Sequence, residues 1–137
     1  MPPLQIHKLF YISQDVFALG EFDPDGETSG TVVNISFDIE QSPENKETWN
    51  AFLSIESNID KSENPPYSFK LEAMGLFTCS ADVDEKAFRG NAFQMLGGSM
   101  RERLSMLTAA GPWPAFLLGA MPMSKAWETM VTGEPEA

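Results

Sequence analysis

The hydrophobic pattern of this chain changes its period near residue 84, and this change limits the folds that the chain can adopt. Before it, apolar residues alternate with polar ones, as in Val33, Ile35, Phe37 and Ile39. After it, apolar residues are four positions apart: Phe88, Ala92, Leu96 and Met100. Alternation indicates half-buried strands, and a step of four indicates an amphipathic helix. Strands followed by helices in separate blocks predict an α+β fold.

Four segments of the first block have the strand pattern. They are residues 4–19, 33–40, 49–56 and 67–79, joined by the polar connections 21–30, 41–48 and 59–66. The alternation changes phase at 13–15, and Gly75 interrupts the last segment. We expect a bulge at each of these two places, because an extra residue or a glycine often marks one. The short connections predict a four-stranded antiparallel sheet.

The second block begins with a long helix, which we expect over residues 85–110. Asp82 or Asp84 is a candidate N-cap, and Gly111 with the prolines beyond it ends the helical pattern. Three glycines inside the helix either kink it or let another backbone approach closely: Gly90, Gly97 and Gly98. Because one helix covers only one face of a sheet, the pattern favours oligomerisation.

The C-terminal part is expected to contain a second, short helix over Ser124–Val131, with Ser124 as its cap. Residues 132–137 have the composition of a flexible acidic tail. We therefore expect a single domain over residues 1–137, with a core of about residues 4–131, because this length suits one hydrophobic core.

Charge and cysteine content exclude several classes of protein. With 20 acidic and 9 basic residues, the formal net charge is −11, which argues against a nucleic-acid partner. One cysteine excludes an internal disulfide, and the N-terminus lacks the basic region of a signal peptide. No window is apolar enough to insert into a membrane. The sequence predicts a cytoplasmic protein.

Residues for catalysis or metal binding are scarce. The chain has one histidine, His7, and one cysteine, Cys79, which we interpret as a surface residue and a small buried apolar residue. Two such side chains are too few for a zinc site. Nucleotide-binding and nucleophile-elbow motifs are absent. We therefore expect no catalytic residue, metal site or cofactor.

The most unusual part of the sequence is an apolar stretch near the C-terminus. Residues 108–123 carry no charge, and six of the eight methionines lie between positions 95 and 130. Methionines and aromatic side chains adapt to different partners, so they suit a binding surface, although they also fill cores. We expect the methionines at 95–106 to pack in the core. For Trp113–Met123 we favour a surface, because a proline-rich loop runs over the outside of a protein.

Four short segments resemble the SecB family of bacterial export chaperones. They are Leu4–Leu9, which resembles the first strand; Glu72–Phe77, with its Gly-apolar-Phe step; Met100–Arg103, at the Arg-Glu turn of the long helix; and Gly111–Leu118, which resembles a Gly-x-Phe-Pro-x-Leu-x-Leu signature with Trp in place of Phe. The resemblance extends over about residues 4–131.

This resemblance implies an ATP-independent holdase, a chaperone that binds unfolded or partly folded polypeptides without enzymatic activity or a cofactor. It implies a homotetramer, arranged as a dimer of dimers packed through the long helices, with candidate interface residues Phe88, Ala92, Leu96 and Met100. It also implies hydrophobic grooves for client chains, with candidate residues Ile35, Phe37, Trp49, Leu53, Trp113, Phe116, Trp127 and Met130.

The chain departs from the family where SecA, the export motor, docks on acidic side chains. Lys70 and Ser68 stand at the matching positions of the fourth strand, and Asp15 is the only acid kept near the first. These departures put the docking of SecA in doubt, and protein export stays one of the roles that the resemblance implies for the holdase. The alternatives are a SecB-like chaperone of a toxin–antitoxin system and a domain that binds a small apolar ligand.

Overall fold

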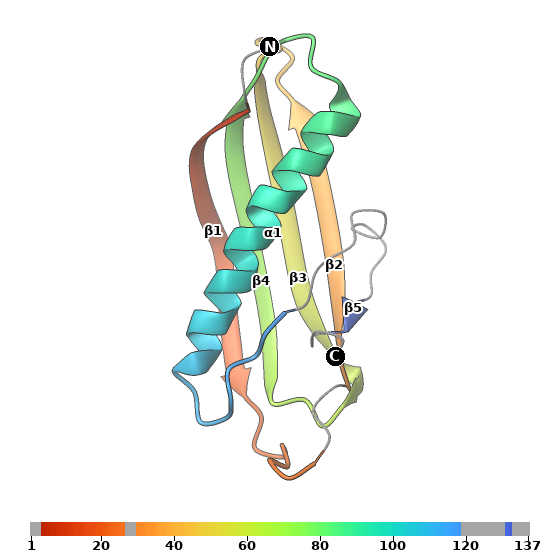
Figure 1. The fold of residues 1–137 in the computed structure, drawn as a ribbon, viewed down its shortest axis with the longest axis vertical. Coiled ribbons are helices and arrows are strands. Elements are labelled where there is room, and N and C mark those ends of the chain that lie inside the picture. Colours follow the sequence, from red (N-terminus) through yellow and green to blue (C-terminus); the bar gives the residue numbers. More distant parts are fainter. Residues whose placement is uncertain (1–3, 27–29, 119–130, 133–137) are drawn as a thin grey trace.

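A computed structural model describes residues 4–26, 30–118 and 131–132 of the chain. Its elements are β1 (Gln5–Ala18), β2 (Gly30–Gln41), β3 (Thr48–Glu63), β4 (Tyr67–Thr78), α1 (Glu85–Ala109) and β5 (Val131–Thr132). Helix α1 lies diagonally across one face of the sheet (Figure 1). The predicted α+β fold, with four long antiparallel strands and one long helix, is confirmed.

The strands are ordered β1-β4-β3-β2-β5, and every neighbouring pair is antiparallel. Strand β1 pairs with β4, so the connection from β1 to β2 crosses the end of the sheet. Val131 belongs to β5, which pairs with Val32 and Val33 of β2, whereas we expected it to end a helix. The remainder of that expected helix, Ser124–Met130, lies outside the described residues, as do residues 133–137.

The irregularities of the sheet lie in β1. Its register against β4 shifts between Ile6 and Lys8 and again between Tyr11 and Ser13. The second shift lies next to the bulge expected at 13–15. The bulge expected at Gly75 is wrong, because this residue pairs regularly with Leu9 and Ala51. A Cβ atom there would lie 2.6 Å from the Phe77 ring, so the glycine leaves room for that ring.

Strand β3 is longer than the sequence suggested. It continues to Glu63, although residues 59–63 were expected in a connection. Side-chain hydrogen bonds support this part: the hydroxyl of Ser57 accepts from the N–H of Phe69 at 2.9 Å, and that of Ser62 accepts from the N–H of Val32 at 2.9 Å. Strands are held by backbone pairing, which a polar sequence allows as well as an apolar one.

The core lies between α1 and the sheet. The face of α1 that touches the sheet carries Phe88, Ala92, Leu96, Met100 and Leu104, which are all at most 1% exposed. The Phe88 ring stacks on Trp49 at 4.5 Å and meets Phe77 edge-on at 5.5 Å. Such burial supplies most of the stability of an amphipathic helix.

This packing corrects the expected oligomer interface. Phe88, Ala92, Leu96 and Met100 contact the chain's own sheet, so they are not available to a second copy. The exposed side of α1 carries Met95, 40% exposed, and Met106, 63% exposed, although both were expected in the core. The helix is continuous through its glycines, and a Cβ atom at Gly90 or Gly98 would meet nothing within 4 Å.

Both ends of α1 follow the sequence signals. Asp84 is the N-cap residue, with extended backbone, although its side chain makes no capping hydrogen bond. Glu85 places a negative charge in the first turn, where the helix dipole favours it. At the other end, the N–H of Gly111 bonds to the carbonyl oxygen of Thr108 at 3.0 Å. The chain leaves the helix at this point and turns back.

Candidate functional site: a groove beside the helix

The segment after α1, residues 111–118, is here named the return segment. It runs back alongside α1 over the same face of the sheet (Figure 1). Phe116 and Leu118 are buried and Trp113 is half-buried, whereas Leu117 is 53% exposed. One side of the return segment therefore packs on the sheet, and the other side remains at the surface.

The hydroxyl of Tyr67 fixes the beginning of the return segment. It lies 2.9 Å from the carbonyl oxygen of Thr108 and 2.8 Å from that of Trp113, and it accepts the N–H of Trp113 at 3.1 Å. A Cβ atom at Gly111 would lie 2.6 Å from this hydroxyl. Glycine is thus required by the close approach of the Tyr67 ring.

Thr108, in the last turn of α1, holds the next part of the return segment. Its hydroxyl donates to the carbonyl oxygen of Leu104 at 2.8 Å and accepts the N–H of Phe116 at 2.8 Å. The Phe116 ring packs on Phe69 of β4, with centroids 5.2 Å apart. Because Thr108 is fully buried, these bonds satisfy polar groups that no water reaches.

Trp113 joins the return segment to the connection between β1 and β2. Its indole N–H donates to the carbonyl oxygen of Leu19 at 3.0 Å, and its ring contacts Phe22 at 5.1 Å. Trp113 and Phe116 were expected to anchor a client chain. In the structure they anchor the return segment on the sheet.

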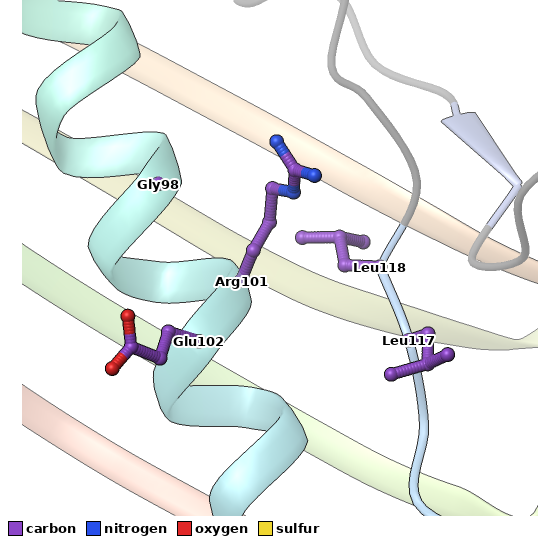
Figure 2. Close-up of a pocket in the computed structure, with 5 residues that line it drawn as sticks. All are labelled: Gly98, Arg101, Glu102, Leu117 and Leu118. Carbon is purple, nitrogen blue, oxygen red and sulfur yellow. The ribbon is translucent and has the colours of Figure 1, made fainter.

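A groove separates the exposed side of α1 from the end of the return segment. Figure 2 shows Leu117 and Leu118 on one side of it and Gly98, Arg101 and Glu102 of α1 on the other. The space has a volume of about 510 Å³. Gly98 has no side chain to narrow it, and the two leucines give it an apolar wall. The Arg101 side chain extends toward Leu118, whereas the carboxylate of Glu102 points away from the leucines (Figure 2). This arrangement suits an apolar side chain whose backbone stays near polar groups.

The expected groove residues are distributed differently in the structure. Four of them, Ile35, Phe37, Trp49 and Leu53, are at most 4% exposed in the core beneath α1. Trp127 and Met130 lie outside the described residues.

Sequence reasoning missed five residues that line the groove: Gly98, Arg101, Glu102, Leu117 and Leu118. Phe116 and Leu118 are two positions apart, which is the spacing of residues on one side of an extended chain. This spacing was the sequence signal for the apolar wall.

The two residues considered for chemistry have structural roles. The Nε2 atom of His7 lies 2.6 Å from the hydroxyl oxygen of Thr78. Cys79 is buried and free, and burial, followed by the charge of Glu47, raises the pKa of its thiol. In the described ranges, no three His, Cys, Asp or Glu side chains gather as a metal site, and no helix has the length and hydropathy to span a membrane.

Lys70 and Ser68 lie on the face of the sheet away from α1. Lys70 stands opposite Asp15 of β1 and Glu56 of β3 in the register of the sheet. The positive charge is thus placed between two acids of neighbouring strands, which makes this part of the surface less acidic than the net charge of the chain suggests.

Comparison with known proteins gives a structural match. No family model matches the chain, and no curated protein matches it. The structure is similar to the SecB-like chaperone Rv1957 of Mycobacterium tuberculosis, with a TM-score of 0.61 and 14% identity over 87% of this chain and 91% of that one. This chain has a SecB-like fold. The fold resemblance inferred from the four sequence segments is confirmed.

Rv1957 was solved in complex with a ChAD peptide from the HigA1 antitoxin, Rv1956. A protein of unknown function from Streptococcus agalactiae also matches, at a TM-score of 0.47 and 11% identity over 85% of this chain and 96% of that one. The SecB-like fold accounts for the long helix across the antiparallel sheet.

Proposed function

We propose that this chain is an ATP-independent holdase that binds extended, apolar polypeptide segments in the groove between α1 and the return segment. The observation that carries the proposal is the position of Leu117, which is 53% exposed at the edge of the groove while its neighbours Phe116 and Leu118 are buried. An exposed leucine beside a groove offers apolar contact to a ligand at little cost, because the surrounding structure is already ordered.

The return segment gives the groove a fixed wall. Hydrogen bonds from Tyr67, Thr108 and Trp113 hold this wall before any ligand arrives. Extended chains bind well to preformed apolar grooves, where alternate side chains enter the groove and the others face solvent. The proposed holdase has no catalytic activity and needs no cofactor.

Two kinds of client are compatible with a SecB-like fold: an exported protein or the antitoxin of a toxin–antitoxin pair. The second is favoured by the similarity to a chaperone bound to an antitoxin peptide. Lys70 and Ser68 favour it too, because they replace the acidic and apolar positions that the SecB family uses for SecA. We therefore propose SecA-independent activity in the cytoplasm, with an antitoxin-like segment as the client.

The holdase is proposed to act as a homotetramer, a dimer of dimers. The exposed face of α1, with Met95 and Met106, is the surface we now assign to contact between copies. Several grooves on one assembly raise the affinity for one long client through effective concentration. Light scattering of the purified protein tests this assembly, and a monomer at micromolar concentration would contradict it.

Leu117→Ser tests the groove. The substitution removes the exposed apolar side chain and leaves the buried anchors in place. Burial of a leucine contributes about 1.5–3 kcal/mol, so affinity should fall roughly tenfold or more. The measurement is fluorescence anisotropy with a labelled, uncharged peptide rich in Leu and Val, together with suppression of the aggregation of denatured citrate synthase.

Phe17→Ser is the matched control. Phe17 is 62% exposed on β1 and stands opposite Ser68, so its loss removes apolar surface on the face of the sheet away from α1 and the groove. Binding should remain near the unmodified level. Equal effects of the two substitutions would place the site elsewhere. Tight binding of a fatty acid, with no binding of peptide, would instead favour the small apolar ligand.

A further inference from the structure

The face of the sheet away from α1, here named the outer face, carries a second apolar surface. In β4 buried residues alternate with half-buried ones, and the half-buried set lies on the outer face. Four apolar side chains adjoin there: Phe10, Phe52, Met74 and Leu76. Phe10 of β1 and Phe52 of β3 both stand opposite Met74 of β4. They form a block across three strands, which we name the outer patch.

Acidic side chains border the outer patch on β2. Asp38 stands opposite Phe52, and Glu40 stands opposite Asn50, two residues further along the strand. Both carboxylates are exposed. A hollow of about 280 Å³ lies at this border, lined by Asp38, Ile39, Glu40, Asn50, Phe52 and Met74. The hollow thus has an apolar floor and an acidic rim.

The charge at the other border is positive. Lys8 of β1 stands opposite Leu76, and its amino group lies 5.5 Å from the centre of the Phe10 ring. Three strand spacings separate β1 from β2, about 14 Å, which exceeds the Debye length of about 8 Å at physiological salt. Lys8 therefore does not neutralise Asp38 and Glu40.

The two acids have no salt-bridge partner among the residues that the structure describes. Within the part of the chain that the structure describes, Asp38 accepts a hydrogen bond from the N–H of Ile39 at 3.0 Å, and neither acid is ion-paired. The surface thus changes from acidic through apolar to basic across the strands. A partner that matches it has the opposite order of charge.

We propose that the outer patch is a docking surface for an extended segment of a partner protein that carries a basic side chain followed by apolar ones. The segment crosses the strands, with Lys or Arg over Asp38 and Glu40 and apolar side chains over Phe52 and Met74. Side chains on one face of an extended chain are about 7 Å apart, so residues i, i+2 and i+4 span the width of the surface. A second copy of this chain fits less well, because it brings a net charge of −11.

This surface is distinct from the two sites already discussed. The groove with Leu117 lies on the α1 side of the sheet. Lys70, at the position that the family uses for SecA, is four residues from Met74 along β4, about 13 Å away. The proposal therefore concerns a different partner contact, and it does not depend on the holdase proposal.

The test compares two labelled peptides that contain either Lys-Ser-Phe-Ser-Leu or Glu-Ser-Phe-Ser-Leu. Binding to the full chain is measured by anisotropy. We expect the lysine peptide to bind and the glutamate peptide to bind at least about tenfold more weakly, since like charges then meet. Asp38→Asn with Glu40→Gln should weaken binding of the lysine peptide about fivefold, the scale of two exposed ion pairs.

The matched control removes two acids of the same face farther from the outer patch, Asp15→Asn with Glu56→Gln, which both stand opposite Lys70. It has the same change in net charge and should change affinity less than about twofold. If both double variants weakened binding of the lysine peptide equally, its affinity would come from general attraction to an acidic protein, and the proposal would be overturned. Failure of the lysine peptide to bind would overturn it too. Leu117→Ser should leave this binding unchanged.

Discussion

The hydroxyl oxygen of Tyr67 lies 2.8 Å from the carbonyl oxygen of Trp113, 46 residues later in the chain. This contact joins the start of β4 to the return segment and sets one wall of the groove. The hydroxyl has one proton to donate and also accepts the N–H of Trp113. Several backbone groups therefore depend on a single side chain.

Tyr67→Phe should lower the free energy of unfolding by about 1–3 kcal/mol, because it leaves the backbone N–H and carbonyl of Trp113 without the hydroxyl that they bond to and removes one of the two hydrogen bonds to the Thr108 carbonyl. Urea unfolding followed by circular dichroism measures the change. Tyr11→Phe is the control, since the Tyr11 hydroxyl bonds to the Ser99 side chain in a part-buried position. A smaller loss is expected there. Equal losses would show that Tyr67 has no special role in holding the return segment.

Gly111→Ala should destabilise the chain, whereas Gly90→Ala should stabilise it. A Cβ atom at position 111 would lie 2.6 Å from the Tyr67 hydroxyl and displace the ring. At position 90 the added methyl meets nothing within 4 Å, and alanine is favoured over glycine in a helix by about 1 kcal/mol. Thermal unfolding measures both variants. A change of the same sign at the two positions would contradict the close approach at Gly111.

Leu96→Ala and Met95→Ala test which face of α1 packs on the sheet. Leu96 is 0% exposed, so its truncation should cost about 2–5 kcal/mol of unfolding free energy. Met95 is 40% exposed, and its truncation should change stability by about 0.5 kcal/mol or less in the monomer. Urea unfolding at several protein concentrations gives both values. A large, concentration-dependent loss for Met95→Ala would locate the contact between copies on this face.

The thiol of Cys79 should react slowly with Ellman's reagent at neutral pH in the folded protein. Burial and Glu47 raise its pKa above the ordinary value, so the reactive thiolate is scarce. In the unfolded chain the thiol has its ordinary pKa and should react quickly. The stability linked to this group is fully present below the unfolded pKa, about 8.5, and decreases as the pH rises above it. Rapid reaction of the native protein would contradict the burial.

The sequence by itself determined the fold class, the four long strands and the long helix, although not the full length of β3 or the strand at Val131. Alternation at Val33–Ile39 and the step of four from Phe88 to Met100 depend only on which side of each element is buried, and both patterns were visible. The end of α1 could also be predicted from the local sequence, because a glycine and prolines stop a helix wherever it packs. The resemblance to SecB rested on these elements together with four short segments.

Only the tertiary structure decided which surfaces face each other. A helical pattern shows that Phe88 and Leu96 are buried, but burial by a sheet and burial by a second copy have the same periodicity. The path of the return segment decides that Leu117 is exposed and that Trp113 faces inward. Contacts with Tyr67 and Leu19 determine this path. Long-range contacts of this kind have no local signature, because their partners are far apart in the chain. The place of the groove was therefore fixed by packing.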